Sequence, residues 1–154
     1  MKPKTEDEAL FKLTALCSRA EYCEHDILEK LRRWEIAGEA QAHIMQHLVE
    51  EKYIDEERYA RAFIRSKVKY NKWGRRKIEQ ALRMKRISET TYAPILEEEC
   101  GESSIDVLRP LLEAKIKTIK ADSTYERNGK LIRFALGRGF DMDLIQKVIQ
   151  EMDL

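Results

Sequence analysis

The sequence has few residues that interrupt helices, with only three prolines and six glycines among 154 residues. It lacks any apolar run long enough to cross a membrane, and its charged start, MKPKTEDEALFKL, lacks the apolar segment of a signal peptide. Its three cysteines show no short paired spacing, which predicts reduced thiols in the cytoplasm. Charged residues make up 37% and hydrophobic residues 43%, proportions typical of amphipathic helices. These observations together favour an all-α cytoplasmic protein.

Motifs of catalysis and cofactor binding are also missing. The sequence has no Ser/His/Asp arrangement, no glycine-rich phosphate loop and no paired cysteine motif, so we expect neither an enzyme nor a cofactor. His43 and His47 have the four-residue spacing of a metal pair, but no motif supplies a third ligand. They flank the apolar positions Ile44 and Leu48, and we interpret them as parts of an ordinary amphipathic helix without a metal.

Three helices are predicted in the first third of the chain. A capping box at Thr5 and Glu8 begins the first, the second covers about residues 23–34, and the third follows Gly38. We expect the third helix to bury Ile44, Leu48 and Tyr53.

The same pattern returns 51 residues later, which predicts an internal repeat. The shift aligns Tyr22 with Trp73, Cys23 with Gly74, Ile27 with Ile78, Leu31 with Leu82, Ile36 with Ile87 and Ile44 with Ile95. In a looser third copy Ile132 and Leu136 repeat the spacing of Ile78 and Leu82, Phe140 corresponds to Ile87, and Asp141 caps a last helix. The predicted fold is all-α, with tandem three-helix units at 5–53, 54–100 and 103–153 that stack into an elongated, curved array.

Positive charge is concentrated in the middle of the chain. Residues 58–86 hold twelve Lys or Arg and a single acid, Glu79, although the whole chain has a net charge of only +1. The flanking segments are acidic, with net charges of −8 over 5–57 and −6 over 87–113. This distribution favours an anionic partner at the middle unit. The simpler alternative is that the acidic and basic segments fold onto each other.

Helical geometry sorts the middle block into two faces. Tyr59, Ala60, Phe63 and Ile64 gather on one side of a helix, and a basic stripe runs along the other. If this helix persists past Ser66, the stripe extends to Lys72. We expect a partner or DNA to contact Arg58, Arg61, Arg65, Lys69, Lys72, Arg75, Arg76, Lys77 and Arg83.

Two simpler interpretations apply to other conspicuous residues. Tyr22, Trp34 and Trp73 could stack on bases, but aromatic residues beside repeated apolar positions more often pack at joints between units. The acidic run 97–99 is interpreted as helix surface and not as catalytic acids.

The stretches YIDEERYARAF and WGRRKIEQALRMKRI resemble the RecX family of bacterial recombination regulators, and the resemblance extends from about Leu10 to Ile149. The residues that match the family pattern are Tyr53, Ile54, Asp55, Glu56, Tyr59, Ala60, Phe63, Gly74, Ile78, Leu82, Lys85 and Ile87. Lys52 and Arg86 replace glycines of that pattern, which predicts left-handed helix ends strained by about 1 kcal/mol. Cys23 stands where the family often has serine, which predicts a weaker helix cap.

The resemblance implies a function in recombination. Members of the family bind RecA filaments on single-stranded DNA and inhibit filament extension, ATP hydrolysis and strand exchange. By this resemblance we expect a monomeric, non-enzymatic regulator whose partners are the RecA filament and single-stranded DNA, with no membrane partner. Two alternatives stay open: a sequence-independent DNA-binding protein, and a scaffold that binds an acidic protein.

Overall fold

The computed structural model describes residues 2–101 and 104–152, and within them the chain is helical without any β-strand. The first group of helices is α1 (Glu6–Cys17), α2 (Glu24–Arg33) and α3 (Gly38–Glu50). The second is α4 (Glu56–Ser66), the π-helix η1 (Lys67–Asn71), α5 (Arg75–Met84) and α6 (Glu89–Cys100). The third is α7 (Ser104–Ile116), α8 (Thr124–Gly137) and α9 (Met142–Glu151).

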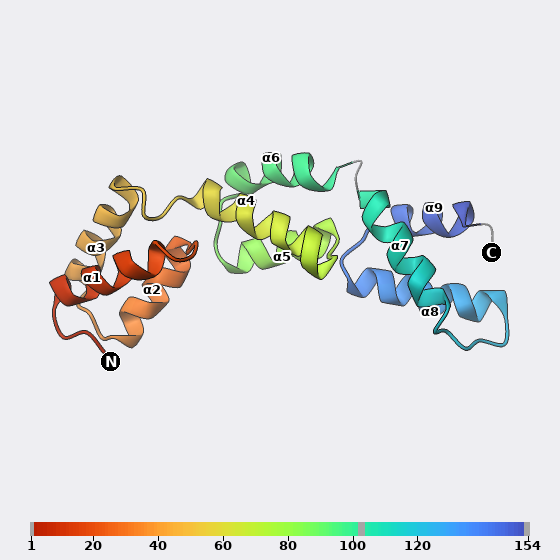
Figure 1. The fold of residues 1–154 in the computed structure, drawn as a ribbon, viewed down its shortest axis with the longest axis horizontal. Coiled ribbons are helices and arrows are strands. Elements are labelled where there is room, and N and C mark those ends of the chain that lie inside the picture. The colour runs from red at the N-terminus through yellow and green to blue at the C-terminus, as the bar shows by residue number, and fades with distance from the viewer. Residues whose placement is uncertain (1, 102–103, 153–154) are drawn as a thin grey trace.

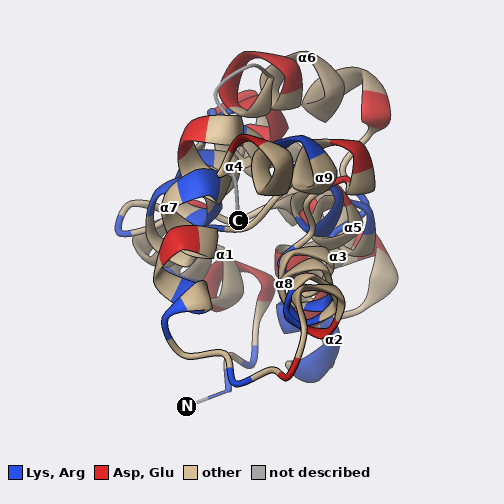
Figure 2. Cartoon of the chain, turned by 90° about the vertical axis from the view of Figure 1, so that its right-hand side faces the viewer, with Lys and Arg blue, Asp and Glu red and all other residues tan. Residues whose placement is uncertain are grey.

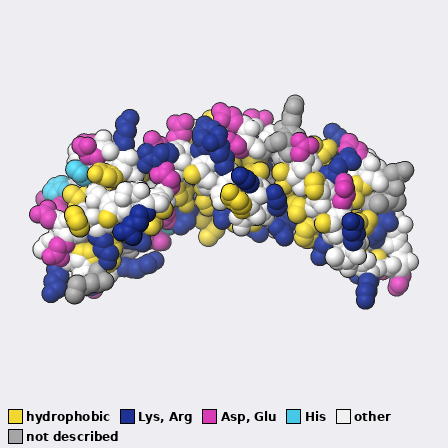
Figure 3. Space-filling view, viewed as in Figure 1, with side chains coloured by type: hydrophobic (Ala, Val, Ile, Leu, Met, Phe, Trp, Pro, Cys, Tyr) yellow, Lys and Arg dark blue, Asp and Glu magenta, His cyan; other side chains and the backbone are white. Residues whose placement is uncertain are grey.

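The three groups follow one another along the long axis, and the two termini lie at opposite ends (Figure 1). The space-filling view has an arched outline (Figure 3). The prediction of an all-α array of three-helix units is therefore confirmed. Positions 103 and 153, the predicted bounds of the third unit, lie outside the described residues.

Each group of helices surrounds one hydrophobic cluster, and Cys23, which precedes α2 of the first group, packs in the second cluster. The first cluster contains Ala9, Leu13, Cys17, Ile27, Leu31, Ile44, Leu48 and Ile54. The second contains Cys23, Tyr59, Ala60, Ile64, Ile78, Leu82, Ile87, Tyr92, Ile95, Leu96 and Cys100. The third contains Leu108, Leu112, Leu131, Ala135, Phe140, Ile145, Val148 and Ile149. Because clusters of this size bury little surface, the contacts between neighbouring units matter for stability.

Tyr53 was expected in the core of the first unit, and this prediction is wrong. Its side chain is 36% exposed, whereas the next residue, Ile54, is buried at 2%. The Ile54 N–H donates to the Leu48 carbonyl at 3.1 Å, which turns Ile54 inward beneath the end of α3. Tyr53 then lies outside, where its ring stacks on His47 with 6.4 Å between centroids.

The third unit departs from the predicted register by one residue. Leu131 and Ala135 are fully buried, while Ile132 is half-buried and Leu136 is 38% exposed. The Phe140 N–H donates to the Ala135 carbonyl at 3.2 Å, so the buried residue of α8 lies five positions before Phe140. The pairing of Ile132 and Leu136 with Ile78 and Leu82 is therefore wrong.

The middle helix of every unit ends in the same way. Glu35, Arg86 and Gly139 have positive φ angles of 56°, 58° and 95°. The residue after each donates its N–H to a carbonyl five positions back: Ile36 to Leu31 at 3.1 Å, Ile87 to Leu82 at 3.1 Å and Phe140 to Ala135 at 3.2 Å. This left-handed ending is a common way to satisfy the last carbonyls of a helix. It turns an apolar residue of each unit back onto its core.

Backbone atoms join the second and third units. At the start of α5 the Gly74 N–H donates to the Arg138 carbonyl at 2.7 Å, and the Arg76 N–H donates to the Gly139 carbonyl at 3.0 Å. A Cβ atom at Gly74 would lie 2.5 Å from backbone atoms of Gly139 and Phe140. The N-terminus of α5 thus meets the C-terminus of α8 without any intervening side chain, and both glycines are required for this approach.

Side chains join the first and second units at the equivalent place. Cys23 occupies the position of Gly74, and its Sγ lies 4.0 Å from the carbonyl oxygen of Lys85, which precedes the left-handed Arg86. The Lys85 ammonium pairs with the Asp26 carboxylate at 2.6 Å. The Asp26 carboxylate also accepts a hydrogen bond from the Cys23 backbone N–H at 3.4 Å. A cysteine at this position therefore replaces a contact between backbone atoms with a thiol against a backbone carbonyl and an ion pair between side chains.

Glu56 adds a titratable group to that joint. Its Oε1 accepts the Glu24 backbone N–H at 3.2 Å, and its Oε2 is buried without a hydrogen-bond partner among the described residues. Burial, together with the nearby Glu24 carboxyl, raises the pKa of Glu56 from 4.5 to about 7. The folded chain retains a proton that the unfolded chain releases near pH 4.5, so this group's contribution to stability falls as the pH rises from about 4.5 to 7.

We predict that Gly74→Ala weakens the joint between the second and third units. The added methyl group clashes with backbone, so the free energy of unfolding should fall by about 1–3 kcal/mol. Gly38→Ala is the matched control, because a Cβ at that helical position meets nothing within 4 Å. Urea denaturation of both variants checks the prediction, and equal stability of the two would contradict it.

Arg86→Gly is predicted to stabilise the chain by about 1 kcal/mol, because glycine adopts the left-handed conformation without the steric cost that arginine has. The same change at Arg33, an exposed residue in the last turn of α2, should destabilise the chain. Thermal and urea unfolding of the two variants should give opposite signs. A loss of stability in Arg86→Gly would show that the arginine side chain contributes more than the strain costs.

Candidate partner-binding surface

Helix α4 places the first arginines of the predicted surface. Asp55 caps it, with its carboxylate accepting the Arg58 N–H at 3.0 Å. Tyr59, Ala60 and Ile64 are buried in the second cluster, as predicted. The opposite side of the helix consequently carries Arg58, Arg61 and Arg65.

The α-helical stripe does not continue to Lys72. α4 ends at Ser66, and Lys67–Asn71 form a π-helix before Lys72 adopts a left-handed conformation with φ 54°. A π-helix closes hydrogen bonds over five residues, and Val68 and Trp73, five positions apart, both pack on the second cluster. Lys69 and Lys72 therefore belong to a wider turn. The 100° rotation per residue of an α-helix, on which the predicted stripe was based, does not hold there.

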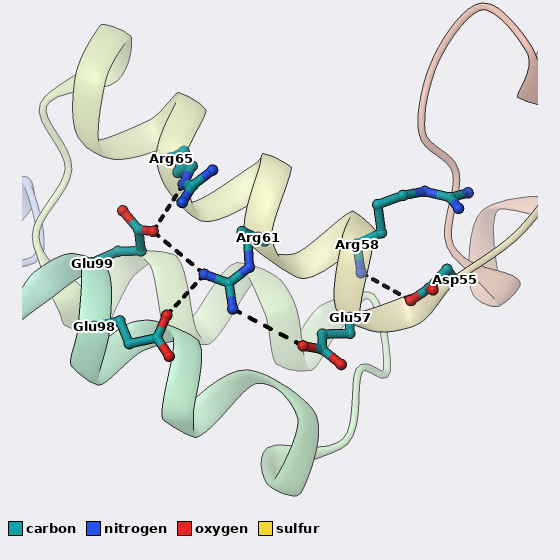
Figure 4. Close-up of polar contacts among 7 residues, drawn as sticks. All are labelled: Asp55, Glu57, Arg58, Arg61, Arg65, Glu98 and Glu99. Atoms are coloured by element: carbon teal, nitrogen blue, oxygen red, sulfur yellow. Dashed lines mark hydrogen bonds and ion pairs between the residues drawn. The ribbon is translucent and has the colours of Figure 1, made fainter.

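The arginines of α4 pair with carboxylates from other segments. Arg61 contacts Glu98 at 2.8 Å and Glu99 at 3.6 Å, and Arg65 contacts Glu99 at 2.8 Å. Figure 4 shows these two side chains directed toward the acids of α6. Arg58 pairs with Glu21 of the first unit.

The cations of α5 also have partners within the chain. Arg75 pairs with Glu97 at 3.0 Å, and Arg76 pairs with Asp141 of the third unit at 3.3 Å. Arg83 pairs with Glu79 at 3.7 Å, as the four-residue spacing suggests, and donates to the Tyr92 hydroxyl at 3.1 Å. Lys77 lies over the Trp73 ring, with Nζ 4.6 Å from its centroid. Trp73 thus packs against the second cluster and lies beneath the ammonium groups of Lys67 and Lys77.

The acidic run 97–99 of α6 is therefore both helix surface and the counter-charge of the basic block. Folding of acidic on basic segments accounts for most of the arginines predicted as contacts. In the view along the array, basic and acidic segments are interspersed around the outline (Figure 2). Lys69 and Lys72 differ, since neither has a carboxylate within 4.0 Å in the described part of the chain.

His43 and His47 were also considered as a possible metal site. His43 Nδ1 lies 3.3 Å from a Glu6 carboxylate oxygen. Among residues 2–101 and 104–152, no three His, Cys, Asp or Glu side chains are grouped so that they could hold a metal ion. No helix in these ranges is long and apolar enough to span a membrane.

Fold and surface together define a tandem helical-repeat protein whose middle unit gathers cations on two helices and the turn between them. The family model for "RecX, second three-helix domain" matches residues 55–93, and that for "RecX, third three-helix domain" matches residues 102–149. The chain belongs to the RecX family.

Individual relatives agree with this assignment. The chain is 30% identical over 141 residues to the regulatory protein RecX of Vibrio campbellii, covering 90% of this chain and 87% of the relative. It is 28% identical over 130 residues to that of Oceanobacillus iheyensis, covering 84% of this chain and 48% of the relative. The chain thus spans about half the length of some relatives and most of others. The crystal structure of RecX from Lactobacillus salivarius shares the fold, with a TM-score of 0.86, 21% identity and 96% coverage of both chains.

We predict that removing the acids of α6 strengthens binding to single-stranded DNA. Replacing Glu97, Glu98 and Glu99 by glutamine frees Arg65 and Arg75 and leaves Arg61 only its 4.0 Å contact with Glu57. Affinity for an oligonucleotide should rise by about three- to tenfold, and the salt dependence should steepen by about 0.7 for each further phosphate that the protein neutralises. Fluorescence anisotropy over a range of salt concentrations measures both quantities. Because these ion pairs are exposed, stability should fall by about 1 kcal/mol or less.

A control variant separates local release of arginines from the change in total charge. Three exposed acids of the first unit, namely Glu39, Glu50 and Glu51, are replaced by glutamine, which removes the same amount of negative charge elsewhere. Equal gains in affinity for the two variants would show that only net charge matters.

Proposed function

We propose that this protein regulates recombination by binding RecA filaments on single-stranded DNA and inhibiting filament extension, ATP hydrolysis and strand exchange. Membership of the RecX family is the observation that carries the proposal. The arched array and the basic middle unit support it, since an elongated chain with a cationic centre can lie along a filament that contains DNA.

The proposed mechanism is occlusion and bridging within the filament. The cationic surface consists of Arg58, Arg61, Arg65, Lys69, Lys72, Arg75, Arg76, Lys77 and Arg83. Several of these arginines are already paired, but exposed ion pairs contribute only about 0–1 kcal/mol each. A phosphate or an acidic side chain of the filament can therefore replace an internal carboxylate at small cost.

This function needs binding alone. We propose that the protein acts as a monomer in the cytoplasm, without catalysis and without a cofactor. Side chains of neighbouring units would then contact successive parts of the filament, because the units follow one another along a single axis.

The direct experiment follows DNA-dependent ATP hydrolysis by RecA while the protein is titrated in. We expect hydrolysis to fall as the protein approaches the concentration of RecA. A parallel anisotropy measurement on single-stranded DNA alone reports binding without RecA. Unchanged hydrolysis at stoichiometric protein would refute the proposed function. Inhibition that follows competition for bare DNA would instead indicate a sequence-independent DNA-binding protein.

At the residue level, Arg75→Glu combined with Arg76→Glu should raise the concentration needed for half-inhibition by about tenfold, because it reverses two charges on the proposed surface. The control is Arg32→Glu with Arg33→Glu, two exposed arginines of the first unit outside that surface. Circular dichroism should show that both variants stay helical. Equal inhibition by the two variants would remove Arg75 and Arg76 from the contact surface.

A further inference from the structure

The π-helix η1 presents an aromatic ring among lysines. Tyr70 is 73% exposed, and the Lys69 Nζ lies 5.3 Å from the centroid of its ring. Lys67 begins the same turn and Lys72 ends it. An exposed ring beside several cations is the combination with which proteins bind single-stranded nucleic acid.

Positive charge at η1 is not compensated by the protein's own acids. Within the described ranges, Lys67, Lys69 and Lys72 have no carboxylate within 4.0 Å, whereas the arginines of α4 pair with acids of the first unit and of α6. An incoming phosphate can approach these lysines without displacing an internal ion pair. The turn is consequently a place in the basic block where an anion meets cations that no carboxylate of the described residues pairs.

The base of the turn is held firmly. Lys67 lies 4.8 Å and Lys77 lies 4.6 Å from the Trp73 ring centroid. The Asn71 carbonyl accepts a hydrogen bond from the Arg138 guanidinium of the third unit at 2.9 Å. Two lysines thus lie over Trp73, whereas one, Lys69, lies over Tyr70, whose ring stays 73% exposed on a supported backbone.

Other exposed aromatic residues lack this setting. Tyr125 is 90% exposed and lines a hollow with Arg133, but it also adjoins Glu126, whose carboxylate pairs with Lys130 at 3.4 Å. Phe11 is 78% exposed and lies in the acidic first unit. Exposure alone therefore does not distinguish Tyr70, whereas exposure among unpaired lysines does.

We propose that Tyr70 stacks on a base of single-stranded DNA while Lys69 and Lys72 contact the flanking phosphates. The proposal deepens the proposed function, on which it rests for the identity of the DNA as that within the RecA filament. An acidic peptide would use the lysines but would gain little from the ring face, whereas every base has a face that can stack.

The test compares Tyr70→Ala with Tyr125→Ala, the matched loss of an exposed tyrosine. Anisotropy measures binding to oligo-dT and to an abasic oligonucleotide of the same length. Tyr70→Ala should weaken binding to oligo-dT by about tenfold and leave binding to the abasic strand unchanged. Tyr70→Trp should restore affinity, and Tyr125→Ala should match the unmodified protein.

The contribution of Lys69 and Lys72 is measured separately, through the salt dependence of binding. Lys69→Gln with Lys72→Gln should reduce the slope of log affinity against log salt by about 0.7 for each phosphate that the variant no longer neutralises. Unlike the ring variant, this pair should weaken binding to oligo-dT and to the abasic strand alike.

The outcomes separate this site from the proposed function. If Tyr70→Ala binds both strands as the unmodified protein does, the stacking site is wrong, even where RecA hydrolysis is still inhibited. Binding of an acidic peptide that depends on Lys69 and Lys72 but not on Tyr70 would also overturn it. If Tyr70→Ala loses affinity for oligo-dT while the unmodified protein leaves RecA unaffected, the stacking site stands and the proposed function fails.

Discussion

Contact between helix ends is the constraint on which the whole array depends. A three-helix unit of this size buries only about ten core side chains, so neighbouring units must share part of their stability. They do so where the N-terminus of one middle helix meets the C-terminus of the next. The left-handed ending of α8 directs the Arg138 and Gly139 carbonyls at the first N–H groups of α5. The first N–H groups and the last carbonyl groups of a helix have no partner within that helix, and here those of α5 and α8 pair with each other.

Charge has two uses in the middle unit, and the structure separates them. Arg61 and Arg65 pair with Glu98 and Glu99 across α4 and α6, so part of the basic block is neutralised within the chain. The lysines of η1 have no such partners among the described residues. A concentration of cations in a sequence thus combines cations that pair within the chain with cations that do not, and only geometry distinguishes the two.

Much of the fold could be predicted because its information is local. Helix caps and apolar residues four apart, such as Ile78 and Leu82, lie within one or two turns of each other. The register of α8 could not be predicted this way, because it is set by the turn at Phe140 and not by the apolar pattern, in which Ile132 and Leu136 look equally suitable. The π-helix could not be predicted for a related reason. Its wider turn interrupts the 3.6-residue period on which helix prediction relies. The pairs between α4 and α6 join residues more than 30 positions apart, beyond the reach of any local pattern.

The exchange of one glycine for a cysteine gives the two joints unequal stiffness. Gly74 lets backbone touch backbone, and peptide groups have no rotamers through which such a contact can relax. At Cys23 the neighbouring units meet through a buried thiol and through the ion pair between the Lys85 and Asp26 side chains. Because charged side chains have rotamers and a contact between backbone atoms has none, we expect the joint between the first and second units to bend more readily than the joint between the second and third.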